Sequence, residues 1–524
     1  MTNDEKIIIT KAEYTSMKDQ IAELSQQVQW FMEQVRLAKH RQFGTSSEKS
    51  QYDQFNLFNE AEATTDDRVS EPELEEIKYK RKKRAGKKDE MLKDLPVETI
   101  DYYLSEEEQI CPECGETMHI MGKDIRRELK IIPAQIKVVE HVRHVYSCRE
   151  CEKDIFGTPI VKAPISEPVI KGSIASPSTI AYIMSQKYVN AMPLYRQEQE
   201  FQRLGIDISR QTMANWVIRC ATDWLEPLYS AMKEILIQHD ILHADESVIQ
   251  VLKEPGKPPQ SNSYMWLYRT SGDTRHPIIL YEYQPDRQKK RPKEFLEGFK
   301  GYIHTDGYEG YHSLPQDIIV CGCWAHARRK FDEALKSLKP LEQIGTKTFA
   351  GKNYCDQLFS IERKLIDCTS KERHQKRLEL SKPVLDEFRT WLQSLGSLPQ
   401  SALGKAVNYT LGQWKYLENY LLDGRCEISN NRAERSIKPF VIGRKNFLFA
   451  DTVRGAKASA IIYSIIETAK ENGLNPMKYL TYLFEKMPNW DFRNNVDLFE
   501  LLFPWSNQLP QNCYIKKFNE QKSD

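Results

Sequence analysis

Two aspartates follow short apolar segments in the second half of the chain. Asp245 comes directly after the run ILHA, and Asp306 comes directly after GYIHT. Each run is typical of a short strand, so we expect both aspartates at the carboxyl ends of strands, where neighbouring strands can bring them together. Aspartates at strand ends are also common turn formers, so these two residues alone do not define a site.

A third carboxylate, Glu434, lies in a segment rich in cations. From residue 429 to residue 457 there are seven basic and two acidic residues. Ser429 or Asn430 can cap a helix here, and Glu434 would then lie within that helix. A ladder of ion pairs along the helix is the alternative, but the cations far exceed their possible partners. A carboxylate within an excess of cations suits a site that binds both a metal ion and a phosphate.

Four cysteines form two CxxC pairs with 33 residues between the pairs. Thiolates at this spacing can bind one Zn²⁺ tetrahedrally from two turns, and residues 124–146 between them alternate as a hairpin does. Disulfide pairing is the alternative, but an odd total of eleven cysteines favours a reducing compartment. We therefore predict a structural zinc ribbon. Its ligands would be Cys111, Cys114, Cys148 and Cys151.

A second group, Cys321, Cys323 and His326, is less specific. It ends an apolar run and begins a helical pattern, and buried small residues at a strand end explain its cysteines adequately. Metal binding there stays open, and His326 is either a structural histidine or an auxiliary residue of an active site. The other cysteines are isolated, and we expect them in the core. They are Cys220, Cys355, Cys368, Cys426 and Cys513.

Residues 194–219 have the pattern of a helix-turn-helix. A helical segment breaks at Gly205, and Ser209 is a good cap for the next helix. Such a polar-capped helix after a glycine turn can enter the major groove of DNA, although plain helical hairpins look the same. Trp216 and Val217 would face inward. The exposed residues that would contact DNA are Arg210, Gln211 and Asn215.

The amino-terminal region has a different pattern. Residues 14–38 place apolar side chains at alternating steps of three and four, which predicts a coiled-coil seam. We expect this seam to pair two copies of the chain, with docking on the chain itself as the alternative. An acidic block at 60–76 and a basic block at 78–88 predict a disordered linker. The basic block is also suited to non-specific contact with DNA phosphates.

From about residue 240 the pattern changes to strands. Three apolar runs in succession, then a helix at 294–299, then further strands predict a mixed α/β sheet. Residues 176–235 and 325–425 have mainly helical patterns. The expected strands are 241–244, 264–268, 278–281, 302–304 and 318–320.

The whole chain is almost neutral, with 75 Lys and Arg against 74 Asp and Glu. A uniformly basic or uniformly acidic protein is therefore excluded. The balance is a cancellation, because the acidic linker block offsets the basic one and the segment around Glu434 is cationic. The local charge thus favours a nucleic-acid partner. We find no apolar stretch near 18 residues and no signal peptide, so we expect no membrane span and a cytoplasmic, nucleoid-associated protein.

Several segments occur in an order that resembles a known family. The main ones are HADES at 243–247, HTDGYEGY at 304–311, CWAHARRKF at 323–331 and NNRAERSIKPFVIGRKNFLF at 430–449. FGTSSEK at 43–49, IETAKENGLNP at 466–476 and a late LFPW agree with them. Together these segments resemble the IS66 family of transposases from bacterial insertion sequences. The family more often has Thr where this chain has Ser247, and either hydroxyl is compatible with the assignment.

The resemblance implies an RNase-H-like catalytic core of the DDE type, with Asp245, Asp306 and Glu434 as its catalytic triad. Two Mg²⁺ ions would activate the attacking hydroxyl and neutralise the leaving oxygen. By analogy with related enzymes, Asp245 would bridge the ions, and Asp306 and Glu434 would each hold one. His326 would be an auxiliary residue at the scissile phosphate. Phosphate and DNA contacts are expected from Arg432, Arg435, Arg444 and Lys445.

The predicted fold is therefore a multidomain α+β chain. Its expected parts are a coiled-coil helix over 1–50, a charged linker over 51–95, a zinc-binding domain over 96–165, a helix-turn-helix region over 170–235, the RNase-H-like α/β core over 236–340 and 426–475, a helical insertion over 341–425, and a tail over 476–524. The 127 residues between Asp306 and Glu434 accommodate the insertion.

The sequence predicts a DNA transposase that binds terminal inverted repeats, cleaves DNA and transfers the strands. Its expected partners are DNA, a second copy of the chain and accessory transposition proteins. The main alternative is a DNA-binding protein without nuclease activity, such as a domesticated transposase. The intact acidic triad counts against that alternative. A junction or repair nuclease on the same core is a third possibility, and the modules for binding DNA ends argue against it.

Overall fold

The computed structural model describes residues 10–43, 136–147 and 160–515, except for 337, 339, 397 and 493. Residues 143–515 belong to one compact unit. The linker and the four predicted zinc ligands, Cys111, Cys114, Cys148 and Cys151, lie outside the described residues.

A six-stranded mixed sheet forms the centre of residues 143–515. Its main strands follow the order β5-β4-β3-β6-β7, and β8 pairs with the far end of β3. Strands β3, β4 and β5 are antiparallel, whereas β6 and β7 run parallel to β3. This confirms the predicted mixed sheet. The strands are β3 (Ile241–Lys253), β4 (Asn262–Thr270), β5 (Ile279–Gln284), β6 (Gly301–His304), β7 (Ile318–Cys321) and β8 (Ala450–Thr452).

Strand β3 is much longer than the run 241–244 suggested. It continues to Lys253 because β4 pairs with it from Leu242 to Gln250. The expectation that Asp245 ends a strand is therefore wrong, since Asp245 lies inside β3, opposite Leu267. Only the parallel pairing with β6 stops early, before Asp245.

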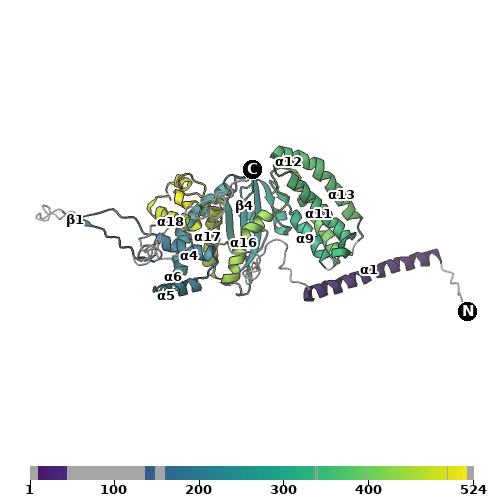
Figure 1. The fold of residues 1–524 in the computed structure, drawn as a ribbon, viewed down its shortest axis with the longest axis horizontal. Coiled ribbons are helices and arrows are strands. Elements are labelled where there is room, and N and C mark those ends of the chain that lie inside the picture. The colour runs from purple at the N-terminus through teal and green to yellow at the C-terminus, as the bar shows by residue number, and fades with distance from the viewer. Residues whose placement is uncertain are drawn as a thin grey trace, which may run out of the picture. The chain divides into compact units, whose positions relative to one another are not determined.

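Helices that precede and follow the strands in the chain pack against the sheet (Figure 1). Preceding it are α4 (Pro177–Tyr188), α5 (Leu194–Arg203), α6 (Arg210–Cys220), a π-helical turn (Ala221–Leu225) and α7 (Glu226–Leu236). Following β8 are α17 (Val453–Glu471) and α18 (Pro476–Lys486). The short helix expected at 294–299 lies earlier, as α8 (Lys290–Phe295).

Helix α17 covers the edge of the sheet at β5. The Ser464 hydroxyl accepts a hydrogen bond from the backbone N–H of Tyr281 at 2.7 Å, and that of Thr468 accepts one from Ile279 at 3.0 Å. These side chains satisfy edge groups that would otherwise be open to pairing with another strand.

Between β7 and α16 (Asn431–Phe447) the chain forms a layer of helices, as the pattern at 325–425 predicts. Arg377 is buried within it and pairs with Glu362 at 2.7 Å. Figure 1 shows these helices grouped beside the sheet. They are α9 (Trp324–Leu335), α10 (Pro340–Gln343), α11 (Lys347–Lys364), α12 (Ser370–Lys376), α13 (Lys382–Ser394), α14 (Ala402–Gly412) and α15 (Trp414–Leu417).

The amino-terminal seam lies on one long helix, α1 (Lys11–Phe43). Its apolar residues Tyr14, Met17 and Ile21 are each more than half exposed on the single chain. Among the described residues, no helix is long and apolar enough to cross a bilayer.

Candidate active site

The sheet register brings Asp245 and Asp306 to one place. The last parallel pair between β3 and β6 is His243 with His304, and their rings stack with centroids 4.4 Å apart. Each aspartate lies two residues beyond its histidine. Because side chains alternate along a strand, Asp245 lies on the same face of β3 as His243. Asp306 follows the end of β6 and, with Glu246, raises the pKa of Asp245 electrostatically.

Asp245 is an unusual carboxyl group. Burial raises its pKa well above the ordinary value, and the charges of Glu246, Asp306 and Glu434 raise it further. One hydrogen bond from the backbone N–H of Glu246, at 2.8 Å, acts in the opposite direction. Three acidic side chains thus act on the half-buried carboxyl group of Asp245, and a bound cation would relieve their repulsion.

Glu434 reaches this place on α16 (Asn431–Phe447), in the first turn of the helix. Asn430 is at the N-cap position, but its side chain makes no capping hydrogen bond. Instead its Nδ2 donates to the carbonyl of Ala244 at 2.7 Å, and its Oδ1 lies 3.0 Å from His243 Nδ1. The expectation of a side-chain cap at Asn430 is therefore wrong, because the buried strand β3 offers the amide stronger partners.

The neighbours of Glu434 come from α9 and not from its own helix. Glu434 Oε2 lies 3.4 Å from Arg329 Nη2, and Glu434 Oε1 lies 3.7 Å from His326 Nδ1. Both Oε1 and Nδ1 are buried and make no hydrogen bond among the described residues. With Cys323 Sγ they form a group of possible ligand atoms within 4.8 Å of one another. An intrahelical ion-pair ladder does not describe this arrangement.

The surroundings of His326 favour its neutral form. Burial lowers its pKa, although Glu434 and Asp306 act in the opposite direction. A neutral imidazole has a free lone pair on one nitrogen, so His326 can accept a hydrogen bond or bind a metal ion. It lies beside Glu434, and its role as an auxiliary residue or a structural histidine stays a prediction.

Three further residues of the site were not expected from the sequence. Glu246 accepts hydrogen bonds from Arg287 Nε and from the Tyr311 hydroxyl, both at 2.8 Å. Arg287 Nη2 also lies 3.9 Å from Asp306 Oδ2. The ion pair between Arg287 and Glu246 therefore holds a positive charge beside Asp306. The acidic residue directly after Asp245 was the available signal, but its partners lie about 40 and 65 residues away.

The cations expected to contact phosphate differ in their surroundings. Arg435 and Lys445 are exposed. Arg432 Nε donates to Glu427 Oε1 at 2.7 Å, so this arginine has an acidic partner. Arg444 is half-buried and donates to the Ser247 hydroxyl at 3.2 Å on β3. Burial lowers the pKa of Arg444.

Helices α5 and α6 form the expected helical pair. Ser209 caps α6 by accepting from the Thr212 N–H at 3.1 Å, and Gly205 in the turn has a φ of 82°. Trp216 and Val217 are buried as expected. The residues expected to contact DNA, Arg210, Gln211 and Asn215, are all exposed.

The isolated cysteines are mostly in the core, as expected, but Cys368 is half-buried. Cys426 is not isolated in space. Its thiol lies with Cys321 and His304 in a buried group of possible ligand atoms within 4.8 Å. This group could not be predicted from the sequence, because Cys426 lies more than 100 residues from the other two.

Family models match most of the chain. Residues 172–458 match the model described as transposase IS66 family, and 108–152 match the zinc-finger binding domain of transposase IS66. Residues 30–100 match a model described as transposase C of IS166 homeodomain, and 464–505 match the IS66 C-terminal element. These matches define a transposase with a zinc-finger domain. The chain belongs to the IS66 family of transposases.

Similar proteins occur in Sinorhizobium fredii. The uncharacterized protein y4hP is 30% identical over 418 residues, which are 75% of this chain and 73% of that protein. The uncharacterized protein y4qI is 27% identical over 531 residues, which are 96% of this chain and 94% of that protein. The second similarity therefore spans nearly the full length of both chains.

Proposed function

We propose that the protein cleaves DNA at the ends of its insertion sequence and joins the 3′ ends to a target, with Asp245, Asp306 and Glu434 as catalytic carboxylates. One observation carries this proposal: the pairing of β3 with β6 brings Asp245 and Asp306 together, and Asn430 joins the start of α16, which carries Glu434, to the same strand β3. Membership of the IS66 family supplies the reaction class.

The strand order supports an RNase-H-like core. Three antiparallel strands are followed by two strands parallel to the first, with β3 at the centre. The first aspartate lies on the central strand and the second after its parallel neighbour. Helix α16 then returns across β3 after the helical layer, which places the third carboxylate on the same face.

The side chains fit divalent cations with oxygen ligands. Asp245, Asp306 and Glu434 supply carboxylate oxygens, which Mg²⁺ prefers. Glu434 Oε1 is buried without a hydrogen-bond partner among the described residues, as expected for a ligand atom. When bound, two Mg²⁺ ions would lower the pKa of the attacking water or 3′-hydroxyl and stabilise the leaving oxygen.

The protein's own residues position these carboxylates. Asn430 holds the start of α16 against β3, and Arg287 with Glu246 supports Asp306. Backbone phosphates would be bound by the exposed Arg435 and Lys445 and the half-buried Arg444. Arg432 is a less favourable phosphate ligand, because it already donates a hydrogen bond to Glu427. His326 would contact the scissile phosphate or hold Glu434 in place.

DNA ends would be bound by other parts of the chain. We assign the exposed residues of α6, Arg210, Gln211 and Asn215, to the major groove. The zinc-finger domain would bind one Zn²⁺ through the two CxxC pairs. The exposed apolar residues of α1 would pair with a second copy of the chain as a coiled coil.

A strand-transfer assay tests the proposal. The full chain is incubated with Mg²⁺, a labelled duplex carrying an end of its insertion sequence and a target plasmid. Joined products are expected with Mg²⁺ and not with EDTA. A protein that binds the end tightly but yields neither nicks nor joined products would instead be a DNA-binding protein without nuclease activity.

A further inference from the structure

A polar pocket of about 840 Å³ lies beside Asp306, between the sheet and the helical layer. The backbone N–H of Tyr308, in the pocket wall, donates to Asp306 Oδ1 at 2.9 Å. From the other side, Gln413 Nε2 donates to the carbonyl of Gly307 at 3.5 Å. The pocket therefore opens within two residues of a proposed catalytic carboxylate. Its volume is within the range of about 300–1,000 Å³ that small-ligand sites occupy.

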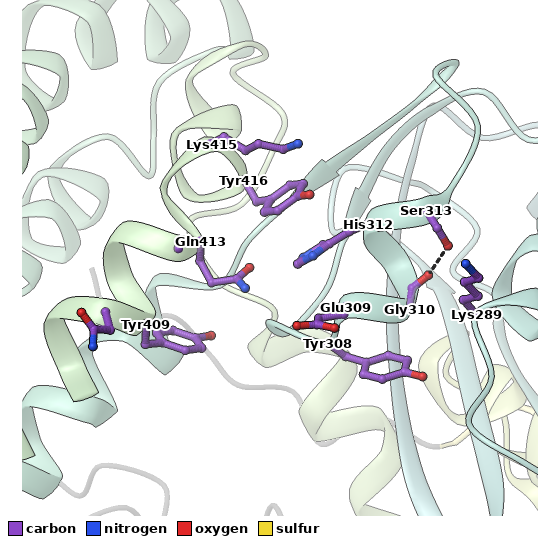
Figure 2. A pocket seen from close by; sticks show the side chains of 12 residues that line it. Lys289, Tyr308, Glu309, Gly310, His312, Ser313, Tyr409, Gln413, Lys415 and Tyr416 are labelled. Carbon is purple, nitrogen blue, oxygen red and sulfur yellow. Dashed lines mark hydrogen bonds between the residues drawn. The ribbon is translucent and has the colours of Figure 1, made fainter. Parts of the chain in front are cut away.

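Aromatic rings line this pocket from both sides. Figure 2 shows Tyr409 and Tyr416 extending from the helical layer toward Tyr308 and His312 of the core. His312 and Tyr416 stack with centroids 4.0 Å apart at 13°. The facing surfaces of these two rings are occupied by each other, so a planar base would have to extend or replace this stack. Aromatic rings stack on any base.

The polar groups of the pocket also suit a nucleotide. Lys289 and Lys415 are exposed at its rim, where they could bind phosphates, and Glu309 is the acidic residue of the lining. Gln413 and His312 interact with each other in the lining of the pocket. Their amide and imidazole groups can instead pair with the edge of a nucleobase. Burial lowers the pKa of His312, which favours the neutral ring.

We propose that this pocket binds one unpaired nucleotide of the DNA strand next to the scissile phosphate, with its base stacked on the tyrosine rings. The inference rests on the proposed function, because the pocket lies beside Asp306, which that proposal assigns to the cleavage site. An enzyme that acts inside a duplex must unstack and unpair a nucleotide to extrude it, and stacking of the base in a pocket offsets that loss. The structure thus assigns the tyrosines of α14 and α15 a role in opening the DNA end.

Binding of an oligonucleotide in EDTA separates this inference from catalysis. The probe is a single-stranded 12-mer with 2-aminopurine at its centre, whose fluorescence falls when the base stacks on an aromatic ring. The full-length wild type is expected to quench the probe. Tyr409→Leu and Tyr416→Leu should each weaken binding roughly tenfold or more and reduce the quenching, since stacking contributes about 1–3 kcal/mol per base.

Matched variants control for folding and charge. Tyr409→Phe and Tyr416→Phe keep the rings and should quench as the wild type does. Lys415→Gln should weaken binding, whereas Lys405→Gln should not, because Lys405 is an exposed lysine of α14 outside the pocket. Unchanged quenching in both Leu variants, or equal losses in Lys415→Gln and Lys405→Gln, would overturn the inference.

A second readout uses cleavage. A mismatch at the nucleotide beside the cleavage site should raise the rate in the wild type, because less pairing energy is lost on extrusion. This gain should be lost in Tyr416→Leu. If the wild type cleaves but shows no gain and no quenching, only the pocket inference fails. If it quenches the probe but never cleaves, only the proposed catalytic function fails.

Discussion

Asn430 Nδ2 donates to the carbonyl oxygen of Ala244 at 2.7 Å, and this bond joins the start of α16 to the strand residue next to Asp245. The position of Glu434 relative to Asp245 therefore depends on Asn430. Asn430→Ala leaves a buried carbonyl and His243 Nδ1 without this partner, which should cost about 1–3 kcal/mol of unfolding free energy. We expect strand cleavage to fall by more than tenfold, measured under conditions in which the variant is folded.

Asn419→Ala is a matched control for that experiment. Asn419 donates to the carbonyl of Val320 at 2.8 Å, so its hydrogen bond joins the helical layer to β7 and does not join α16 to β3. A similar loss of stability with little loss of cleavage is expected. If the two alanine variants lose cleavage to the same extent, Asn430 has no special role in placing Glu434.

The pH dependence of the metal-free protein tests the environment of Asp245. Its folded-state pKa is raised, chiefly by burial, so the stability present at acid pH is lost as the pH rises through that raised value. Asp245→Asn should remove this loss, so the variant should be more stable than the wild type at pH 7 when both are free of metal. Thermal unfolding in EDTA from pH 4 to pH 8 measures it.

The same melts with added Mg²⁺ give the second half of this prediction. The cation should restore stability to the wild type at neutral pH and should have little effect on Asp245→Asn. Parallel pH profiles for the two proteins in EDTA would contradict the account of a repelled, half-buried carboxyl.

The three candidate carboxylates could be named from the sequence, but the residues that hold them in place could not. The motifs around Asp245 and Asp306 predicted strands, and pairing of His243 with His304 brings the two aspartates together. The length of β3 could not be predicted, because its second half is fixed by pairing with β4 across a turn.

Other features depend on contacts between distant segments. Asn430 has the residue type and position of a helix cap, yet the partner that decides its conformation is a strand 186 residues earlier. The pocket combines Tyr308 of the core with Tyr409 of the helical layer. Sequence periodicity describes one element at a time, so it predicts neither of these arrangements.

Arg377 should be essential to the helical layer. It is buried, pairs with Glu362, and donates to the carbonyls of Tyr420 and Cys426, each at 2.8 Å. Arg377→Met would leave a largely buried carboxylate and these carbonyls without their donor, at a cost of about 3–5 kcal/mol. Urea unfolding measures the change. Lys364→Met, at an exposed position, should cost little, and equal losses in both variants would refute this prediction.

If α6 enters the major groove, substitutions at its exposed amino-terminal residues should weaken DNA binding, and a substitution at its other end should not. Arg210→Ala and Asn215→Ala should each weaken binding to the end of the insertion sequence by about 1–3 kcal/mol and reduce its preference over random DNA. Arg219→Ala is the control, because Arg219 is at the other end of α6 and pairs with Asp223 at 3.3 Å. Binding titrations with the DNA end and with random DNA, each at several salt concentrations, measure the affinity and the preference. Loss of binding only in Arg219→Ala would place the DNA elsewhere.

The most direct test of the central claim compares DNA cleavage by single carboxylate variants of the full chain in Mg²⁺. Asp245→Asn, Asp306→Asn and Glu434→Gln should each lose at least about a hundredfold in cleavage rate while still binding the DNA end. Asp317→Asn, an exposed aspartate just before β7, should cleave like the wild type. Cleavage by any of the three variants at the wild-type rate would contradict the proposed site.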